Sequence, residues 1–124
     1  LAYGALAVGE EAEILVDARG GHLYHARYRR RTDGVDVLAA PSALAPDEAR
    51  ASLEARIWLA DEAALTAAAV PAPGPAIEVR SGGRAHAADL LHLGLARLAA
   101  HGPTPIDALA PLYLRSFTPK VHAR

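Results

Sequence analysis

Residues 14–24 read Ile14-Leu15-Val16-Asp17-Ala18-Arg19-Gly20-Gly21-His22-Leu23-Tyr24 and decide the start of the fold. The apolar run 14–16 predicts a strand buried on both faces, and the glycine pair predicts a turn. Residues 22–30 then form an alternating pattern, in which successive side chains would point to opposite faces of a half-buried strand. Its two expected faces are Tyr24, Ala26 and Tyr28 against Leu23, His25, Arg27 and Arg29. Because Asp33-Gly34 predicts a hairpin before a return strand over 35–40, we expect an antiparallel three-stranded meander.

The rest of the chain alternates helical and strand patterns. Before the meander we expect a helix stub over 1–8, ended by Gly9 and an acidic patch at Glu10, Glu11 and Glu13. After the meander, the expected elements are a helix over 46–55, a strand over 57–60, a helix over 61–69, a strand over 76–79 and a helix over 85–100. Gly102 and Pro103 end the last helix. With right-handed crossovers, the order β-β-β-α-β-α-β-α predicts an α/β domain of the ribonuclease H-like type. Its mixed five-stranded sheet would carry helices on both faces, and the apolar segment 111–115 would pack back on it.

The composition is that of a single domain over residues 1–124, with 52% hydrophobic and 22% charged residues. A net charge of -1 provides no global field for nucleic acid or an anionic membrane. The absence of cysteine excludes disulfides, cysteine-ligated zinc, iron–sulfur clusters and thiol nucleophiles. It is compatible with a reducing cytoplasm, where we expect the protein to act. No apolar run approaches the roughly 20 residues of a membrane-spanning helix.

Six histidines raise the question of a metal site. The best spacing is that of His86, Asp89 and His92, because ligands at i, i+3 and i+6 of a helix can lean toward one ion. These positions spread over roughly 120° of helix surface. We therefore favour a solvated polar face and predict no metal ligand. His22 and His25 fall on opposite faces of their strand and are expected at the surface.

Basic residues concentrate in one place, around the second strand. They are Arg27, Arg29, Arg30 and Arg31, with Arg19, Tyr24 and Tyr28 nearby in sequence. Such a cluster could contact an RNA backbone and stack a base. Strand arginines more often keep a sheet edge soluble. We favour that interpretation, because the tyrosines fall on the face opposite Arg27 and Arg29.

Asp17 is the candidate catalytic carboxylate, because it follows a buried strand at a turn. We favour the alternative that its side chain caps the turn and pairs with Arg19. Asp61 is likewise expected to cap the helix that follows it. No nucleophile elbow or phosphate loop has the required spacing. We predict no catalytic residue, no cofactor-binding residue and no cofactor.

Two strings at opposite ends of the chain resemble one family. The hairpin 17–24 resembles the D-A-R-x-G-E-V-Y hairpin of the bacterial TsaB family of threonylcarbamoyladenosine biosynthesis proteins, and 111–115 resembles its C-terminal P-x-Y-L-R. The resemblance implies an actin-like ATPase superfold of two ribonuclease H-like lobes. This chain would be the C-terminal lobe of a longer protein, with 1–9 the tail of a preceding helix. The matching residues, for which we expect a structural role, are Asp17, Ala18, Arg19, Tyr24, Pro111, Tyr113, Leu114 and Arg115.

The function that the resemblance implies is that of a scaffold. The TsaB family works with the related protein TsaD, which carries the metal and transfers the threonylcarbamoyl group to the tRNA adenosine next to the anticodon, and with the ATPase TsaE. TsaB itself is regarded as non-catalytic. The resemblance thus implies a TsaD-like and a TsaE-like partner, reached mainly through the absent N-terminal lobe. It also implies tRNA contact only within the complex and no membrane partner, and it leaves a homodimer open.

Two alternatives remain at this point. An enzyme lobe of the TsaD or glycoprotease-like branch would bind ATP between two lobes and carry a T-D-N-like turn, which this sequence lacks. An RNA-binding ribonuclease H-like module would use the arginine cluster, and its affinity for RNA would fall steeply as salt rises.

Overall fold

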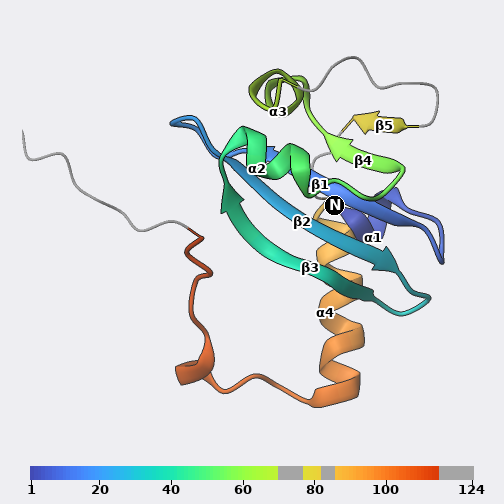
Figure 1. Cartoon of the computed structure of the whole chain (residues 1–124). Helices are drawn as coiled ribbons and strands as arrows, with labels where there is room; N and C mark the ends of the chain where they lie inside the picture. The colour runs from blue at the N-terminus through green and yellow to red at the C-terminus, as the bar shows by residue number, and fades with distance from the viewer. Residues whose placement is uncertain (70–76, 82–85, 115–124) are drawn as a thin grey trace, which may run out of the picture.

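The computed structural model describes residues 1–69, 77–81 and 86–114. In chain order the elements are α1 (Ala2–Ala5), β1 (Glu11–Asp17), β2 (Leu23–Arg30), β3 (Val35–Leu44), α2 (Pro46–Ala51), β4 (Ile57–Ala60), α3 (Glu62–Ala67), β5 (Glu78–Ser81), α4 (Ala87–His101) and the short 3-10 helix η1 (Ile106–Ala108). Figure 1 shows their arrangement along the chain. The predicted loop over 70–75 lies outside the described residues.

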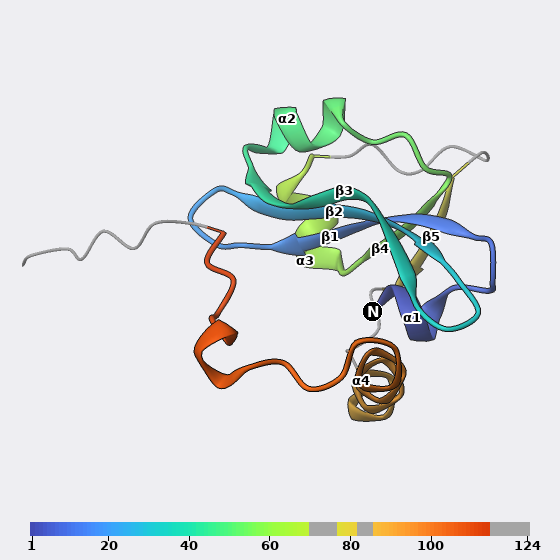
Figure 2. The same ribbon diagram turned by 90° about the horizontal axis from the view of Figure 1, so that it is seen from below.

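The strands form one five-stranded sheet in the order β3-β2-β1-β4-β5. The meander is antiparallel, with β1 paired to β2 and β2 to β3, whereas β4 joins β1 in parallel and β5 joins β4 in parallel. Figure 2 shows α2 on one side of this sheet and α1 and α4 on the other. The predicted α/β fold, a mixed five-stranded sheet with helices on both faces, is confirmed.

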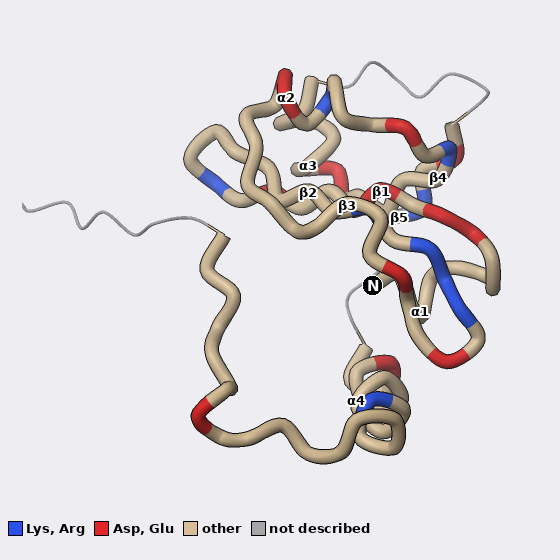
Figure 3. Tube along the Cα trace, turned by 60° about the horizontal axis from the view of Figure 1, so that its bottom comes forward, with Lys and Arg blue, Asp and Glu red and all other residues tan. Residues whose placement is uncertain are grey.

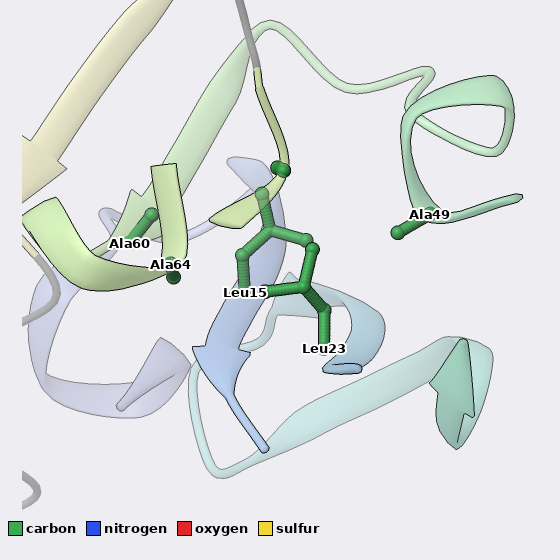
Figure 4. Close-up of a cluster of buried hydrophobic side chains, with 6 residues drawn as sticks. Leu15, Leu23, Ala49, Ala60 and Ala64 are labelled. Atoms are coloured by element: carbon green, nitrogen blue, oxygen red, sulfur yellow. The ribbon is translucent and has the colours of Figure 1, made fainter. Parts of the chain in front are cut away.

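Two apolar clusters hold the helices to the sheet. On one face, Leu15 and Leu23 pack against alanines of α2 and α3, including Ala49 and Ala64 (Figure 4). On the other face, Ile14 and Leu59 belong to a second cluster with α1. Strand β4 contributes to both clusters, which is why its short run of apolar residues was recognisable as central.

Several predicted boundaries are wrong, and strand pairing and the contacts of Glu13 explain two of them. Strand β1 begins at Glu11 rather than Ile14, because Glu11 and Glu13 already pair in register with β2. Helix α2 ends at Ala51 rather than near Ala55, because the backbone N–H groups of Glu54 and Ala55 donate to Glu13 Oε1 instead of to helix carbonyls.

The C-terminal part of the chain departs further from expectation. Segment 111–113 is exposed, and Tyr113 retains 81% of its accessible surface. Figure 1 shows η1 and residues 109–114 standing apart from the sheet. The prediction that this segment packs back on the domain is therefore wrong for 111–113. Pro103, Pro105 and Pro111 favour an irregular backbone between α4 and this segment. No helix among the described residues is long and apolar enough to cross a bilayer.

Candidate functional site

The hairpin turn between β1 and β2 is built by Asp17. Its Oδ1 accepts a hydrogen bond from the backbone N–H of Arg19 at 2.8 Å, and the N–H of Ala18 donates to the His22 carbonyl at 3.1 Å. Arg19 has a φ of 57°, a left-handed conformation that the Asp17 bond helps to hold. The capping role predicted for Asp17 is confirmed, and its carboxylate serves the turn.

Asp61 also does what the sequence predicts. Its Oδ1 accepts from the N–H of Ala64 at 2.7 Å, which satisfies one of the free donors at the start of α3. Both candidate acids that follow strands are therefore capping residues. Because β1 and β4 pair in parallel with Leu15 opposite Ala60, Asp17 and Asp61 follow neighbouring strands at the same edge of the sheet.

Glu13, which we expected in an acidic patch at the end of a helix stub, is the most buried charged side chain in the described part of the chain. Its side chain has 0% exposure. His25 Nε2 lies 2.8 Å from Glu13 Oε2, and the N–H groups of Glu54 and Ala55 donate to Oε1 at 3.0 and 2.9 Å. His25, which we expected at the surface, is only 5% exposed. The antiparallel register places Leu15 opposite His25, so both buried groups share the face covered by α2.

The hydrogen bonds decide the charge state of Glu13. Burial alone would raise its pKa, but the bond to His25 and the bonds from the Ala55 and Glu54 backbone outweigh it and hold the pKa below its usual value. Both carboxylate oxygens are engaged within the protein. Glu13 therefore holds the α2–β4 connection against the sheet by hydrogen bonds, and we call this arrangement the Glu13 clamp. Neither carboxylate oxygen is left without a partner, and a substrate could not replace either partner at no cost.

The arginines around β2 form ion pairs and a ring contact within the domain. Arg27 pairs with Glu54, Arg29 with Glu11 and Arg31 with Asp36, and the Arg30 guanidinium stacks 3.7 Å above the Tyr3 ring. Figure 3 shows this basic stretch beside the acidic start of β1. These pairs largely neutralise the positive field that would attract RNA. The predicted placement of Tyr24 and Tyr28 on the face opposite Arg27 and Arg29 is confirmed by the strand register.

Tyr24 and Tyr28 line an apolar groove on the face that carries α1. The groove has a volume of about 350 Å³ and is bounded by the sheet, by α1 and by Leu93 of α4. Its sheet wall includes Ile14 and Val16, and burial raises the pKa of Tyr28. No sequence pattern predicted this groove, because it forms where α4 stands away from the sheet (Figure 2).

A second electrostatic centre joins the chain start to the outer edge of the sheet. Arg80 on β5 donates through two nitrogens to the two carboxylate oxygens of Glu10, each at 2.8 Å. It also bonds Glu78 and the Ala5 carbonyl. The hydrogen bond from Arg80 is the main cause that lowers the pKa of Glu10 to about 2. The network fixes the end of α1 to β5.

This network predicts a pH dependence of stability. A carboxyl whose pKa is lowered by folding contributes stability above its unfolded pKa of about 4.5, and that stability is lost as the pH falls toward 2. We expect urea midpoints to fall between pH 5 and pH 2.5, and Glu10→Gln to remove part of the difference. Glu62→Gln, an exposed control, should retain the full pH dependence. A Glu10→Gln protein with the same acid loss as the parent would contradict the assignment.

The histidines on α4 do not converge on an ion site. His86 and His92 are exposed, while Asp89 is half-buried against Gly4 of α1, where a Cβ would collide with the carboxylate. Among residues 1–69, 77–81 and 86–114, no group of three or more metal-ligating side chains lies close enough to hold an ion.

The residues of the two family-like strings lie in different surroundings. Asp17, Ala18 and Arg19 form the turn, and Tyr24 lines the groove. Pro111 and Tyr113 are exposed and Leu114 is half-buried, whereas Arg115 lies outside the described residues. A role for this set stays a prediction.

The arrangement of strands and helices matches solved structures. An uncharacterised protein from Pseudomonas aeruginosa, described as similar to the peptidase YeaZ, superposes with a TM-score of 0.70 at 19% identity, over 92% of this chain and 53% of that one. YeaZ from Pseudomonas aeruginosa superposes with a TM-score of 0.66 at 18% identity, over 86% of this chain and 50% of YeaZ. The chain has a YeaZ-like fold. It spans about half the length of these YeaZ-like proteins.

The sequence comparisons add no further relative. No protein-family model matches the chain, and no curated protein sequence matches it. The YeaZ-like fold therefore rests on the three-dimensional arrangement of the strands and helices alone.

Proposed function

We propose that this chain is the C-terminal lobe of a TsaB-like scaffold protein that supports threonylcarbamoylation of the tRNA adenosine next to the anticodon. YeaZ is another name for TsaB. The observation that carries the proposal is the match of 92% of this chain to one half of a YeaZ-like protein. The hairpin and tail strings quoted above point to the same family independently of the structure.

The scaffold role is supported by how the polar side chains are used. Asp17 and Asp61 cap a turn and a helix, and Glu13 holds a connection to the sheet. A general acid or base must lie within hydrogen-bond reach of a substrate. These carboxylates instead accept hydrogen bonds from the domain's own backbone. The proposed role of this chain is therefore to provide a binding surface, while a TsaD-like partner and a TsaE-like ATPase carry out the chemistry in the cytoplasm.

Reconstitution of the reaction tests the proposal. The full-length protein would be mixed with the TsaD-like and TsaE-like proteins of the same organism, ATP, the threonylcarbamoyl donor and unmodified tRNA, and the modified nucleoside measured by mass spectrometry. We expect modification to require the full-length protein and the TsaD-like protein together, with neither sufficient alone. Equal yields with and without the full-length protein would overturn the scaffold role, and product formed without the TsaD-like protein would favour an enzyme.

A further inference from the structure

Helix α4 turns its most apolar side away from the domain. Leu90, Leu91, Leu95 and Leu98 are 62, 60, 54 and 50% exposed. At about 100° per residue these four leucines share an arc of roughly 140°. The side of α4 that faces the rest of the domain carries Leu93, Ala96 and Ala100, which line the hollows between α4, α1 and the β2–β3 hairpin. We call the four exposed leucines the leucine face.

An exposed leucine cluster of this kind indicates a missing contact. Scattered apolar side chains are normal on a surface, but a contiguous patch on one helix marks an interaction site. Asp89 and Arg97 are the formally charged residues in α4. With so few charges, the leucine face suits burial against another apolar layer, and it lacks the lysines and arginines that hold amphipathic helices to anionic membranes.

The start of the chain lies beside this helix. Leu1 of the α1 segment and Leu93 of α4 border the same groove, and Gly4 lies against the Asp89 carboxylate. Figures 1, 2 and 3 all place the N-terminus next to α4. Polypeptide that precedes Leu1 would therefore begin beside α4. YeaZ-like proteins have about twice the length of this chain, which is enough for a layer of the required size.

We propose that the leucine face of α4 is the docking surface for an apolar layer of the same polypeptide, contributed by the lobe that precedes Leu1. The inference rests on the proposed two-lobe organisation. It assigns α4 as the element that joins the lobes and explains why its inner side is poorly packed on the sheet while its outer side is apolar.

The lack of cysteine in these 124 residues allows a direct test by thiol labelling. Leu95→Cys would be made in the 124-residue chain and in the full-length protein, and the labelling rate of its peptide followed by mass spectrometry. We expect labelling in the full-length protein to be at least about tenfold slower, as follows from an interface that costs about 1.4 kcal/mol or more to open. Val37→Cys, exposed to a similar degree on β3, should label at the same rate in both.

The outcomes separate the docking surface from the function. Equal labelling of Leu95→Cys in both proteins overturns the docking inference, even where the full-length protein supports tRNA modification. Protection of that site in the full-length protein sustains the inference, even where tRNA modification fails. Protection that already occurs in the 124-residue chain and grows with its concentration assigns the leucine face to a second copy and also overturns the inference.

Discussion

Replacing Glu13 with alanine is expected to lower the free energy of unfolding by about 3–5 kcal/mol. The substitution removes the acceptor of His25 and of the Glu54 and Ala55 N–H groups, and it leaves these donors buried or half-buried without a partner. Each unsatisfied donor costs about 1–3 kcal/mol. Urea unfolding followed by circular dichroism at pH 7 measures the loss.

The comparison with Glu13→Gln sharpens this prediction. Glutamine keeps an oxygen that can accept from the two backbone N–H groups but loses the negative charge, so we expect a smaller loss of about 1–2 kcal/mol. A control substitution, Glu62→Gln in the first turn of α3, removes an exposed charge and should cost less than about 1 kcal/mol. If Glu13→Ala proved as mild as Glu62→Gln, the clamp described for the α2–β4 connection would be wrong.

The second large effect is expected at Leu15. This side chain is 1% exposed and lies in the cluster between the sheet, α2 and α3 (Figure 4). Leu15→Ala should lower the free energy of unfolding by about 3–4 kcal/mol, since it loses the transfer energy of the side chain and leaves a cavity. Thermal and urea unfolding of the same variant should agree in rank.

Leu98→Ala is the matched control for Leu15→Ala, because it makes the same chemical change at a half-exposed position on α4. In the 124-residue chain it should cost less than about 1 kcal/mol. Equal losses at Leu15 and Leu98 would contradict the placement of the leucine face, since they would mean that Leu98 is buried within this domain.

The parts of the fold that were predictable depend on local signals. The run from Ile14 to Val16, the alternation after His22 and the turn at Asp33-Gly34 each act within a few residues, and they locate the meander. The caps Asp17 and Asp61 were predictable for the same reason, because a cap needs only the backbone two or three residues ahead of it.

The rest depended on partners far away in the sequence. Glu13 is buried because its face lies under the α2–β4 connection, and the acceptor role needs N–H groups that are 41 and 42 residues distant. The alternation of residues along the first strand did indicate where Glu13 lies. Glu11 and Glu13 share a face with Leu15 and pair in register with Arg29 and Arg27, a pattern that favours a strand over the end of a helix.

The placement of α4 could not be predicted from its own period. Helical spacing shows which leucines share an arc, but it does not show which side of the helix meets the sheet. That choice depends on what else packs there. The exposure of the leucine face therefore could not be predicted from this chain alone. The proposed first lobe would supply the apolar layer that covers it.

The measurement that tests the central proposal most directly is the amount of threonylcarbamoyladenosine in tRNA from cells depleted of the full-length protein. Nucleosides would be quantified by mass spectrometry while the level of the TsaD-like protein is followed by immunoblot. We predict that the modified nucleoside falls while the TsaD-like protein remains present, and that resupplying the full-length protein restores it. An unchanged level of threonylcarbamoyladenosine after depletion would contradict the assignment of this chain to a TsaB-like scaffold.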